Sequence, residues 1–202
     1  MSDPTPDASL QVRPMALDDC DRVSEIRVRG WQFAYRGLMP QPFLDGLSVE
    51  QDAERRRARY RDGGNAVTEL VAVRGGTIVG WAAHGPYRDG DVRTGDAELY
   101  ALYVDAAHLG TGVGRALLGT VLEQCAGHTR VRLWVLKENA RARRFYEIAG
   151  FVADGAEEPY EVDGVAVPEV RYVKELGLTA AWGSGRGPGP RPRRGWGGPG
   201  PR

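Results

Sequence analysis

Residues 98–115 read ELYALYVDAAHLGTGVGR, and this stretch is the most informative part of the chain. The pattern predicts a strand, a short turn, and a loop with glycine at positions 110, 112 and 114 that opens a helix. Glycine has no Cβ, so the backbone of such a loop can come close to a bulky anion. The free N–H groups and the dipole at the start of a helix attract the same anion. The stretch therefore predicts a site for a phosphorylated cofactor.

Two common phosphate-binding motifs do not fit this loop. A Walker A loop ends in Gly-Lys-Ser/Thr, whereas Gly114 is followed by Arg115 and Ala116. A dinucleotide fingerprint needs the spacing GxGxxG, and its third position is Arg115 when counted from Gly110 and Leu117 when counted from Gly112. The remaining interpretation is a pyrophosphate loop of the G-x-G-x-G type, placed after a strand of an antiparallel sheet.

The hydrophobic periodicity outside this stretch predicts alternating strands and helices. The predicted strands are Leu10–Arg13, Thr68–Val73, Thr77–Ala83, Glu98–Val104, Val131–Leu136, Phe151–Val152 and Val167–Lys174. The predicted helices run from Asp18 or Asp19 to about Tyr35, and over Ser48–Arg61, Gly112–Ala126 and Asn139–Ala149. This order indicates an α/β (α+β) fold, with a mixed, largely antiparallel central sheet flanked by helices.

Composition limits the class of protein. The 202 residues contain 27 basic and 27 acidic side chains, but residues 1–178 carry 22 and 27, a net charge of about −5. That balance argues against a nucleic-acid partner. Two distant cysteines argue against a metal or redox site. The N-terminus lacks a signal pattern and no apolar run reaches about 18 residues, so we expect a cytoplasmic protein without a membrane span.

The two ends differ in composition from the middle. Residues 1–8 are polar with two prolines, and 13 of the 24 residues from 179 to 202 are glycine or proline. Such segments cannot build a hydrophobic core. We predict a disordered N-terminus over 1–8, one folded domain over 9–178 and a disordered tail over 179–202.

A second motif follows the glycine loop by about 30 residues. It reads LWVLKENARARRFYEIAGF and contains Asn139, Tyr146 and the pair Gly150-Phe151. Together with the glycine loop, over residues 10–176, the chain resembles the GCN5-related N-acetyltransferase (GNAT) family. The segment RGWQFAYRGLMP, residues 29–40, also resembles the first helix of many members. One departure is Leu109, where the family usually has Gln or Arg; Arg115 is a candidate to supply that charge.

The resemblance implies acetyl-CoA as acetyl donor and an amine as acceptor. It places the pantetheine arm beside Leu102, Tyr103 and Val104, and further contacts at Asn139 and Tyr146. The pyrophosphate is expected on the loop formed by Leu109, Gly110, Thr111, Gly112, Val113, Gly114 and Arg115.

Acetyl transfer needs a base and an acid. An alkyl amine with a pKa of about 10.4 is protonated at pH 7, and forming the neutral amine costs about 4.6 kcal/mol. Its proton must therefore be removed before it can attack. Glu98, at the start of the loop-bearing strand, is the candidate base through a water, and His84 is the alternative. Some family members carry the base at the position of Trp134, which cannot accept a proton. Tyr146 matches the family's acid for the leaving thiolate, although a core aromatic is the simpler interpretation.

The sequence says less about the substrate that accepts the acetyl group. Its cleft is expected between the first two helices and the acidic segment 154–170, with Trp31, Tyr35 and Tyr160 as candidate walls. The acidic segment is equally consistent with a solvated hairpin. Two functions stay open: an N-acetyltransferase acting on a small molecule or peptide, and a non-catalytic acyl-CoA-binding sensor with the same fold. A homodimer also stays open, whereas nucleic-acid binding through the arginine tail is disfavoured.

Overall fold

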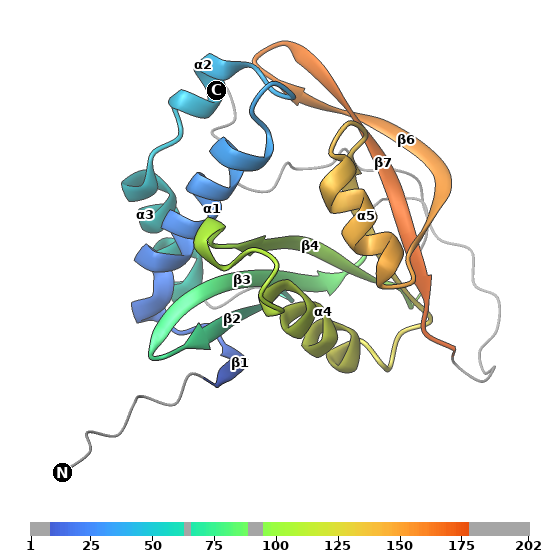
Figure 1. Ribbon diagram of the computed structural model, residues 1–202, viewed down its shortest axis with the longest axis horizontal. Helices are drawn as coiled ribbons and strands as arrows, with labels where there is room; N and C mark the ends of the chain where they lie inside the picture. The colour runs from blue at the N-terminus through green and yellow to red at the C-terminus, as the bar shows by residue number, and fades with distance from the viewer. Residues whose placement is uncertain (1–8, 63–65, 89–94, 178–202) are drawn as a thin grey trace.

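The computed structural model describes residues 9–62, 66–88 and 95–177 (Figure 1). A seven-stranded sheet with the order β1-β2-β3-β4-β5-β7-β6 forms the centre, and only the β4–β5 pair is parallel. The strands are β1 (Leu10–Pro14), β2 (Thr68–Arg74), β3 (Thr77–Pro86), β4 (Ala97–Val104), β5 (Arg130–Leu136), β6 (Val152–Val162) and β7 (Val165–Glu175). The helices are α1 (Cys20–Ala34), α2 (Gln41–Asp45), α3 (Val49–Arg61), α4 (Val113–Gln124) and α5 (Ala140–Ile148). The predicted fold class is confirmed.

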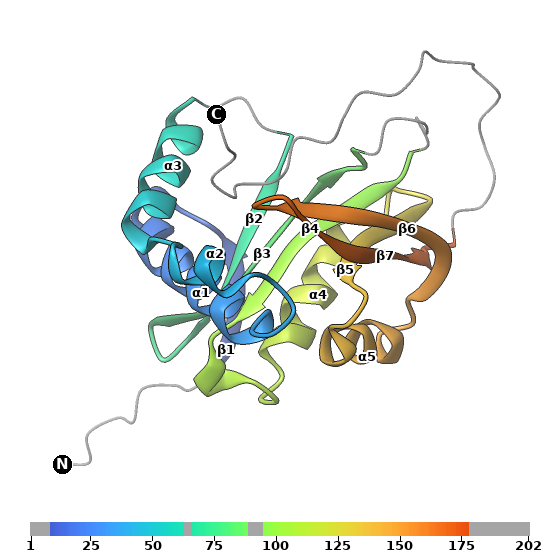
Figure 2. The ribbon, with the colours of Figure 1, turned by 90° about the horizontal axis from the view of Figure 1, so that it is seen from above.

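Helices cover both faces of the sheet (Figure 2). On one face, α4 and α5 pack against the core cluster that contains Leu70, Val113, Leu117 and Tyr146. On the other face, α1 packs against a second cluster with Val71 and Trp81. Leu70 and Val71 face opposite clusters because successive side chains of a strand alternate between its two faces.

Local signals place most element boundaries. Ser48 begins α3 by accepting a hydrogen bond at Oγ from the backbone N–H of Gln51, at 3.2 Å. Asn139 begins α5 in the same way, with its Oδ1 accepting from the N–H of Ala142 at 3.1 Å. Asp19 precedes α1 as predicted, but its carboxylate accepts from Arg13 and the N–H of Ala16 rather than from the helix.

Two expectations about the elements change. The short strand predicted at residues 151–152 begins one residue later and extends to Val162 as β6, paired with β7 around a turn at Asp163-Gly164. Acidic side chains on the exposed face of β6 hid its period-two pattern. The five-residue helix α2 was also not predicted, because one and a half turns are too short for a periodicity signal. The predictions for residues 1–8 and 179–202 lie outside the described residues.

The sheet opens between β4 and β5. The two strands pair only at Ala97–Val131 and Glu98–Arg132, after which β5 continues along β7. On its other edge β4 stays paired with β3, with a bulge that leaves Tyr100 between two paired neighbours. A bulge increases the local twist. Because β4 and β5 pair at two positions only, residues 99–104 of β4 have no β5 partner, and their backbone edge is open toward α5.

Buried ion pairs join α1 and α3 to the sheet. The Arg27 guanidinium donates to Asp52 Oδ1 at 2.8 Å, with both side chains about 95% buried. Arg56 bridges Asp52 at 3.5 Å and Glu69 of β2 at 2.5 Å, and Trp81 Nε1 also donates to Glu69 at 2.8 Å. These contacts set the position of α1, which carries one wall of the cavity described below.

We expect Asp52→Ala to lower the free energy of unfolding by about 3–5 kcal/mol, because it leaves two buried guanidiniums without their shared carboxylate. Urea unfolding measures the change. Asp21→Ala is the matched control: Asp21 pairs with Arg57 on the same two helices but is 70% exposed, and should cost less than about 1 kcal/mol. Equal losses in the two variants would contradict a special role for the buried pairs.

Within the described residues, no helix is long and apolar enough to cross a membrane, and no group of three or more His, Cys, Asp or Glu side chains is arranged to hold a metal ion. Both cysteines are free and buried.

Candidate active site

A cavity of about 1220 Å³ lies where β4 and β5 separate. Its walls come from α1, β4, the glycine loop, α5 and the β6–β7 hairpin. Nearly all residues predicted for the site line this one cavity: Glu98, Leu102, Tyr103, Val104, Leu109, Gly110, Gly112, Gly114, Arg115, Asn139 and Tyr146. Thr111, Val113 and the alternative base His84 are the predicted residues that do not.

The glycine loop has the backbone that the sequence indicated. Gly110 and Gly112 take φ values of 79° and 92°, in the left-handed region that disfavours side chains. Gly112 begins α4, so the N–H groups of Val113, Gly114 and Arg115 have no acceptor within the helix. The Val113 side chain is fully buried and fixes the first turn of α4 in the core. The loop can therefore present several N–H donors to an anion.

Close packing brings α4 onto the sheet. A Cβ at Gly80 of β3 would stand 2.8 Å from Val113 Cγ1 and 3.0 Å from Leu117 Cδ1, closer than side chains tolerate. Glycine at position 80 thus lets the first turn of α4 approach the strand that neighbours β4.

One basic residue at the loop was missed by the sequence reasoning. Arg74, at the end of β2, donates from Nη1 to Thr111 Oγ1 at 3.0 Å and from Nη2 to the Thr111 carbonyl at 3.1 Å. Thr111 therefore acts in holding the loop rather than in lining the cavity. Arg74 brings a positive charge next to a loop that has Leu109 in place of a polar side chain. Nothing in the local sequence of β2 indicates this contact across 37 positions.

Tyr146 presents a protonated hydroxyl to the cavity. It is 9% exposed, and its ring packs edge-on between Phe145 and Phe151 at centroid distances of 5.2 and 5.8 Å. Burial, followed by the nearby Tyr103, raises the pKa of Tyr146 well above its ordinary value. Within the described residues, no protein group hydrogen-bonds to this hydroxyl. It can therefore donate to a group bound in the cavity.

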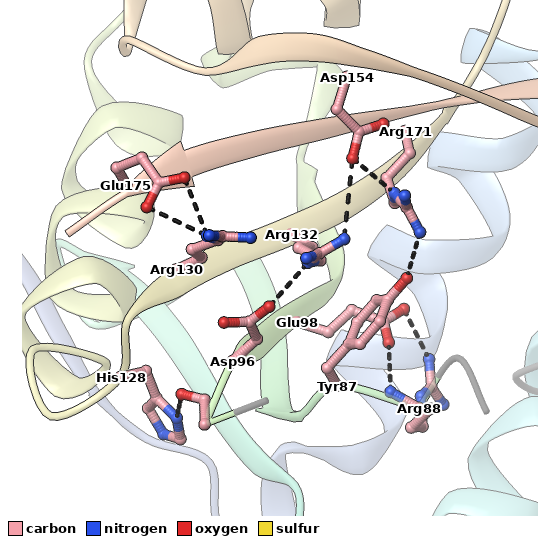
Figure 3. A network of polar contacts seen from close by, with 11 residues as sticks. Tyr87, Arg88, Asp96, Glu98, His128, Arg130, Arg132, Asp154, Arg171 and Glu175 are labelled. Carbon is pink, nitrogen blue, oxygen red and sulfur yellow. Dashed lines mark hydrogen bonds and ion pairs between the residues drawn. The ribbon is translucent and has the colours of Figure 1, made fainter. Parts of the chain in front are cut away.

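Glu98 is a buried carboxylate with a fixed orientation (Figure 3). It is 4% exposed; Oε2 accepts from the backbone N–H of Arg88 at 3.2 Å and Oε1 from Arg88 Nη2 at 3.3 Å. The Arg88 guanidinium lies 3.6 Å from the centroid of the Tyr100 ring. Arg88 was not predicted, because its partner is ten positions away across the β3–β4 connection.

A polar network behind Glu98 ties the hairpin to the central strands (Figure 3). Arg171 of β7 donates to the Tyr87 hydroxyl at 2.6 Å and to Asp154 of β6 at 2.8 Å. Arg132 of β5 pairs with the buried Asp96 at 2.9 Å. The network sets the hairpin against the strand end from which Glu98 projects.

His84 occupies a different site. It lines a second cavity of about 510 Å³, where Nε2 contacts Gln124 Oε1 at 2.8 Å and Nδ1 contacts Cys125 Sγ at 3.5 Å. Because it does not line the large cavity, its position argues against the alternative base. Burial raises the pKa of the Cys125 thiol to about 11, so this thiol is a weak nucleophile.

The chain is similar in sequence to known proteins. The Acetyltransferase (GNAT) family model matches residues 31–151. The uncharacterized N-acetyltransferase YuaI of Bacillus subtilis is 28% identical over 163 residues, covering 80% of this chain and 90% of that protein. The uncharacterized N-acetyltransferase Rv2669 of Mycobacterium tuberculosis is 30% identical over 142 residues, covering 69% of this chain and 86% of that protein.

Solved structures share the fold. YncA of Salmonella typhimurium, solved with its cofactor acetyl-CoA, superposes with a TM-score of 0.64 at 22% identity, covering 85% of this chain and 96% of that chain. PaiA N-acetyltransferase of Thermoplasma acidophilum, in complex with coenzyme A, superposes with a TM-score of 0.63 at 18% identity, covering 83% and 99%.

The position of His84 predicts a pH dependence of stability. Burial lowers its pKa, and the hydrogen bond to Gln124 only partly opposes this. As the pH falls below about 6.5, the unfolded chain takes up a proton at this residue before the folded protein does, so the free energy of unfolding decreases. We expect His84→Gln to lose less stability than the wild type between pH 7 and pH 5 in urea unfolding. A His84→Gln variant that loses as much stability as the wild type over this range would contradict the assignment.

Proposed function

The chain belongs to the acetyltransferase (GNAT) family, and from this premise we propose that it moves an acetyl group from acetyl-CoA directly to the amine of a small molecule or peptide. One observation carries the proposal. A single cavity joins the glycine loop, the open edge of β4, the unbonded Tyr146 hydroxyl and the anchored Glu98 carboxylate. We further propose that residues 9–178 form the catalytic domain and that the protein is cytoplasmic.

The loop and the strand edge suit the two parts of coenzyme A. The pyrophosphate would accept hydrogen bonds from the N–H groups at the start of α4, with Arg115 on the cavity wall and Arg74 behind the loop. The pantetheine arm contains amide groups, and these would pair with the backbone of Leu102–Val104 as an added strand. In this arrangement the thioester would lie between α5 and the point where β4 and β5 separate.

Glu98 and Tyr146 then divide the proton transfers. Glu98, through a water, takes the proton of the ammonium, and the free amine attacks the thioester carbonyl carbon. A C–N bond forms, the C–S bond breaks, and the electron pair leaves on sulfur. The Tyr146 hydroxyl hydrogen-bonds to the developing thiolate and gives it a proton as the bond breaks. The attacking nitrogen carries one proton more than the amide product and releases it to water, and Tyr146 takes a proton back from water. Because the pKa of Tyr146 is raised, the residue stays protonated over the whole working pH range.

A non-catalytic acyl-CoA sensor is the second candidate. Leu109 favours it, because the loop lacks the usual polar side chain there, and so does the pairing of Glu98 with Arg88. A panel of primary amines and short peptides, offered with acetyl-CoA under a free-thiol readout, separates the two. Thiol release supports the enzyme, whereas coenzyme A binding without turnover of any acceptor supports the sensor.

We expect Tyr146→Phe to lower kcat by about 10²-fold or more, since it removes the acid for the leaving thiolate. The Kd for coenzyme A, measured by calorimetry, should change by less than about twofold, because the ring that packs in the core is retained. Tyr60→Phe is the control, since Tyr60 lies outside the cavity and is 48% exposed. Loss of coenzyme A binding with kcat unchanged would show that Tyr146 is a binding residue and not the acid.

We expect Glu98→Gln to lower kcat/KM at pH 7 by about 10²-fold. The deficit should shrink as the pH approaches the amine pKa of about 10.4, where the acceptor no longer needs a base. Thiol release measured from pH 7 to pH 9.5 tests this, with Glu123→Gln, exposed on α4, as control. A deficit that is constant over this range would assign Glu98 a structural role.

A further inference from the structure

Aromatic side chains form the wall of the cavity opposite the glycine loop. Trp31 of α1 stands with ring centroids 5.1 Å from Tyr35, 6.0 Å from Phe43 and 6.2 Å from Tyr160 of β6. Trp134 of β5 lines the same cavity. These flat apolar surfaces match a flat apolar ligand better than a sugar or a polyol.

The hairpin closes this side of the cavity. Val162 and Val167, next to the hairpin turn, belong to one buried cluster with Trp31, Phe43 and Leu44. The tip of β6–β7 thereby reaches α2 across the opening (Figure 1). An extended peptide would need an open groove past these contacts, so the closed wall favours a small acceptor.

Glu169 of β7 projects into this aromatic region. Alternation along β7 puts Val167, Glu169 and Arg171 on one face; Val167 packs on the Trp31 cluster and Arg171 bonds to Tyr87. Glu169, between them, lines the cavity. Tyr35 and Tyr160 line the same cavity, so the Glu169 carboxylate shares this region with the two tyrosines.

The acceptor side is acidic. The carboxylates among its lining residues are Glu98, Glu161, Asp163 and Glu169, and its arginines are Arg59 and Arg88, the latter paired with Glu98. The other two lining arginines, Arg115 and Arg141, belong to α4 and α5 on the cofactor side. A second carboxylate brought in by the acceptor would therefore meet like charges in a partly buried space.

We propose, on the basis of the acetyl transfer proposed above, that the acceptor is a small primary amine with an aromatic body and no carboxylate of its own. The ammonium is positioned by Glu169, and the aromatic body lies against Trp31, Trp134 and Tyr160. Glu169 positions the acceptor, and Glu98 takes its proton.

Matched amines test the substrate class. 2-Phenylethylamine and phenylalanine share their amine and ring and differ by a carboxylate; ethanolamine retains the amine without the ring; phenylalanyl-glycinamide presents the same ring on a peptide. We expect kcat/KM for phenylethylamine to exceed that for phenylalanine by about 10²-fold, and that for ethanolamine by about tenfold or more. It should also exceed that for the peptide. Equal or faster turnover of phenylalanine, ethanolamine or the peptide would overturn the inference.

Glu169→Gln tests the positioning role. We expect KM for phenylethylamine to rise about tenfold with kcat nearly constant, and the preference over phenylalanine to shrink, since the repelled carboxylate no longer faces a charge. The control is Glu175→Gln, the same change on the same strand, where the carboxylate is 64% exposed and pairs with Arg130 outside the cavity. An unchanged preference in Glu169→Gln would overturn the assignment.

Binding separates failure of this inference from failure of the proposed function. Calorimetry with the coenzyme A-loaded protein measures the affinity for phenylethylamine and phenylalanine without any turnover. Selective binding of phenylethylamine in a protein that releases no thiol would retain the acceptor site and refute the enzymatic proposal. Thiol release with acidic or polyhydroxy amines, and no binding of phenylethylamine, would retain the enzymatic proposal and refute the aromatic acceptor site.

Discussion

The separation of β4 from β5 is the constraint on which the rest of the site depends. Two strands that stayed paired would fill the space between them with their own hydrogen bonds, and no backbone edge would remain for a ligand. Here the parallel pairing ends after two residue pairs, and β5 is held by β7 instead. The open edge of β4, the first turn of α4 and the start of α5 therefore face one cavity.

The opening requires support on both sides, and that support is largely electrostatic. On one side, the buried contacts of Arg27 and Arg56 with Asp52 hold α1 and α3 to the sheet. On the other, Arg171, Tyr87 and Asp154 join the hairpin to the strand ends. Buried pairs of this kind add little net stability compared with apolar packing, but breaking one is costly, so they specify a single arrangement. A fixed arrangement is what proton transfer between Glu98, a bound amine and Tyr146 would need.

Most of the elements were predictable because their signals are local. Ser48 and Asn139 cap their helices within three residues, and the glycines of the loop take the backbone angles for which they are suited. The predicted site residues also converge, since both motifs flank the same pair of strands. Arg74 and Arg88 were not predicted as parts of the site, and Glu169 was included only as one acidic side chain of the segment 154–170 expected at the acceptor cleft. Their contacts depend on which strand ends meet, and no short pattern encodes that meeting.

The sequence by itself determined the fold class, the conformation of the glycine loop and the helix that carries Asn139 and Tyr146. Capping, glycine conformation and periodicity act over a few residues, so they can be read without the fold. The tertiary structure alone decided that β6 runs its full length, that His84 faces a separate cavity, and that Glu169 enters the aromatic wall. All three depend on strand register and on packing between distant segments. A shift of one residue in register would turn the side chains of His84 and Glu169 to the other face of the sheet.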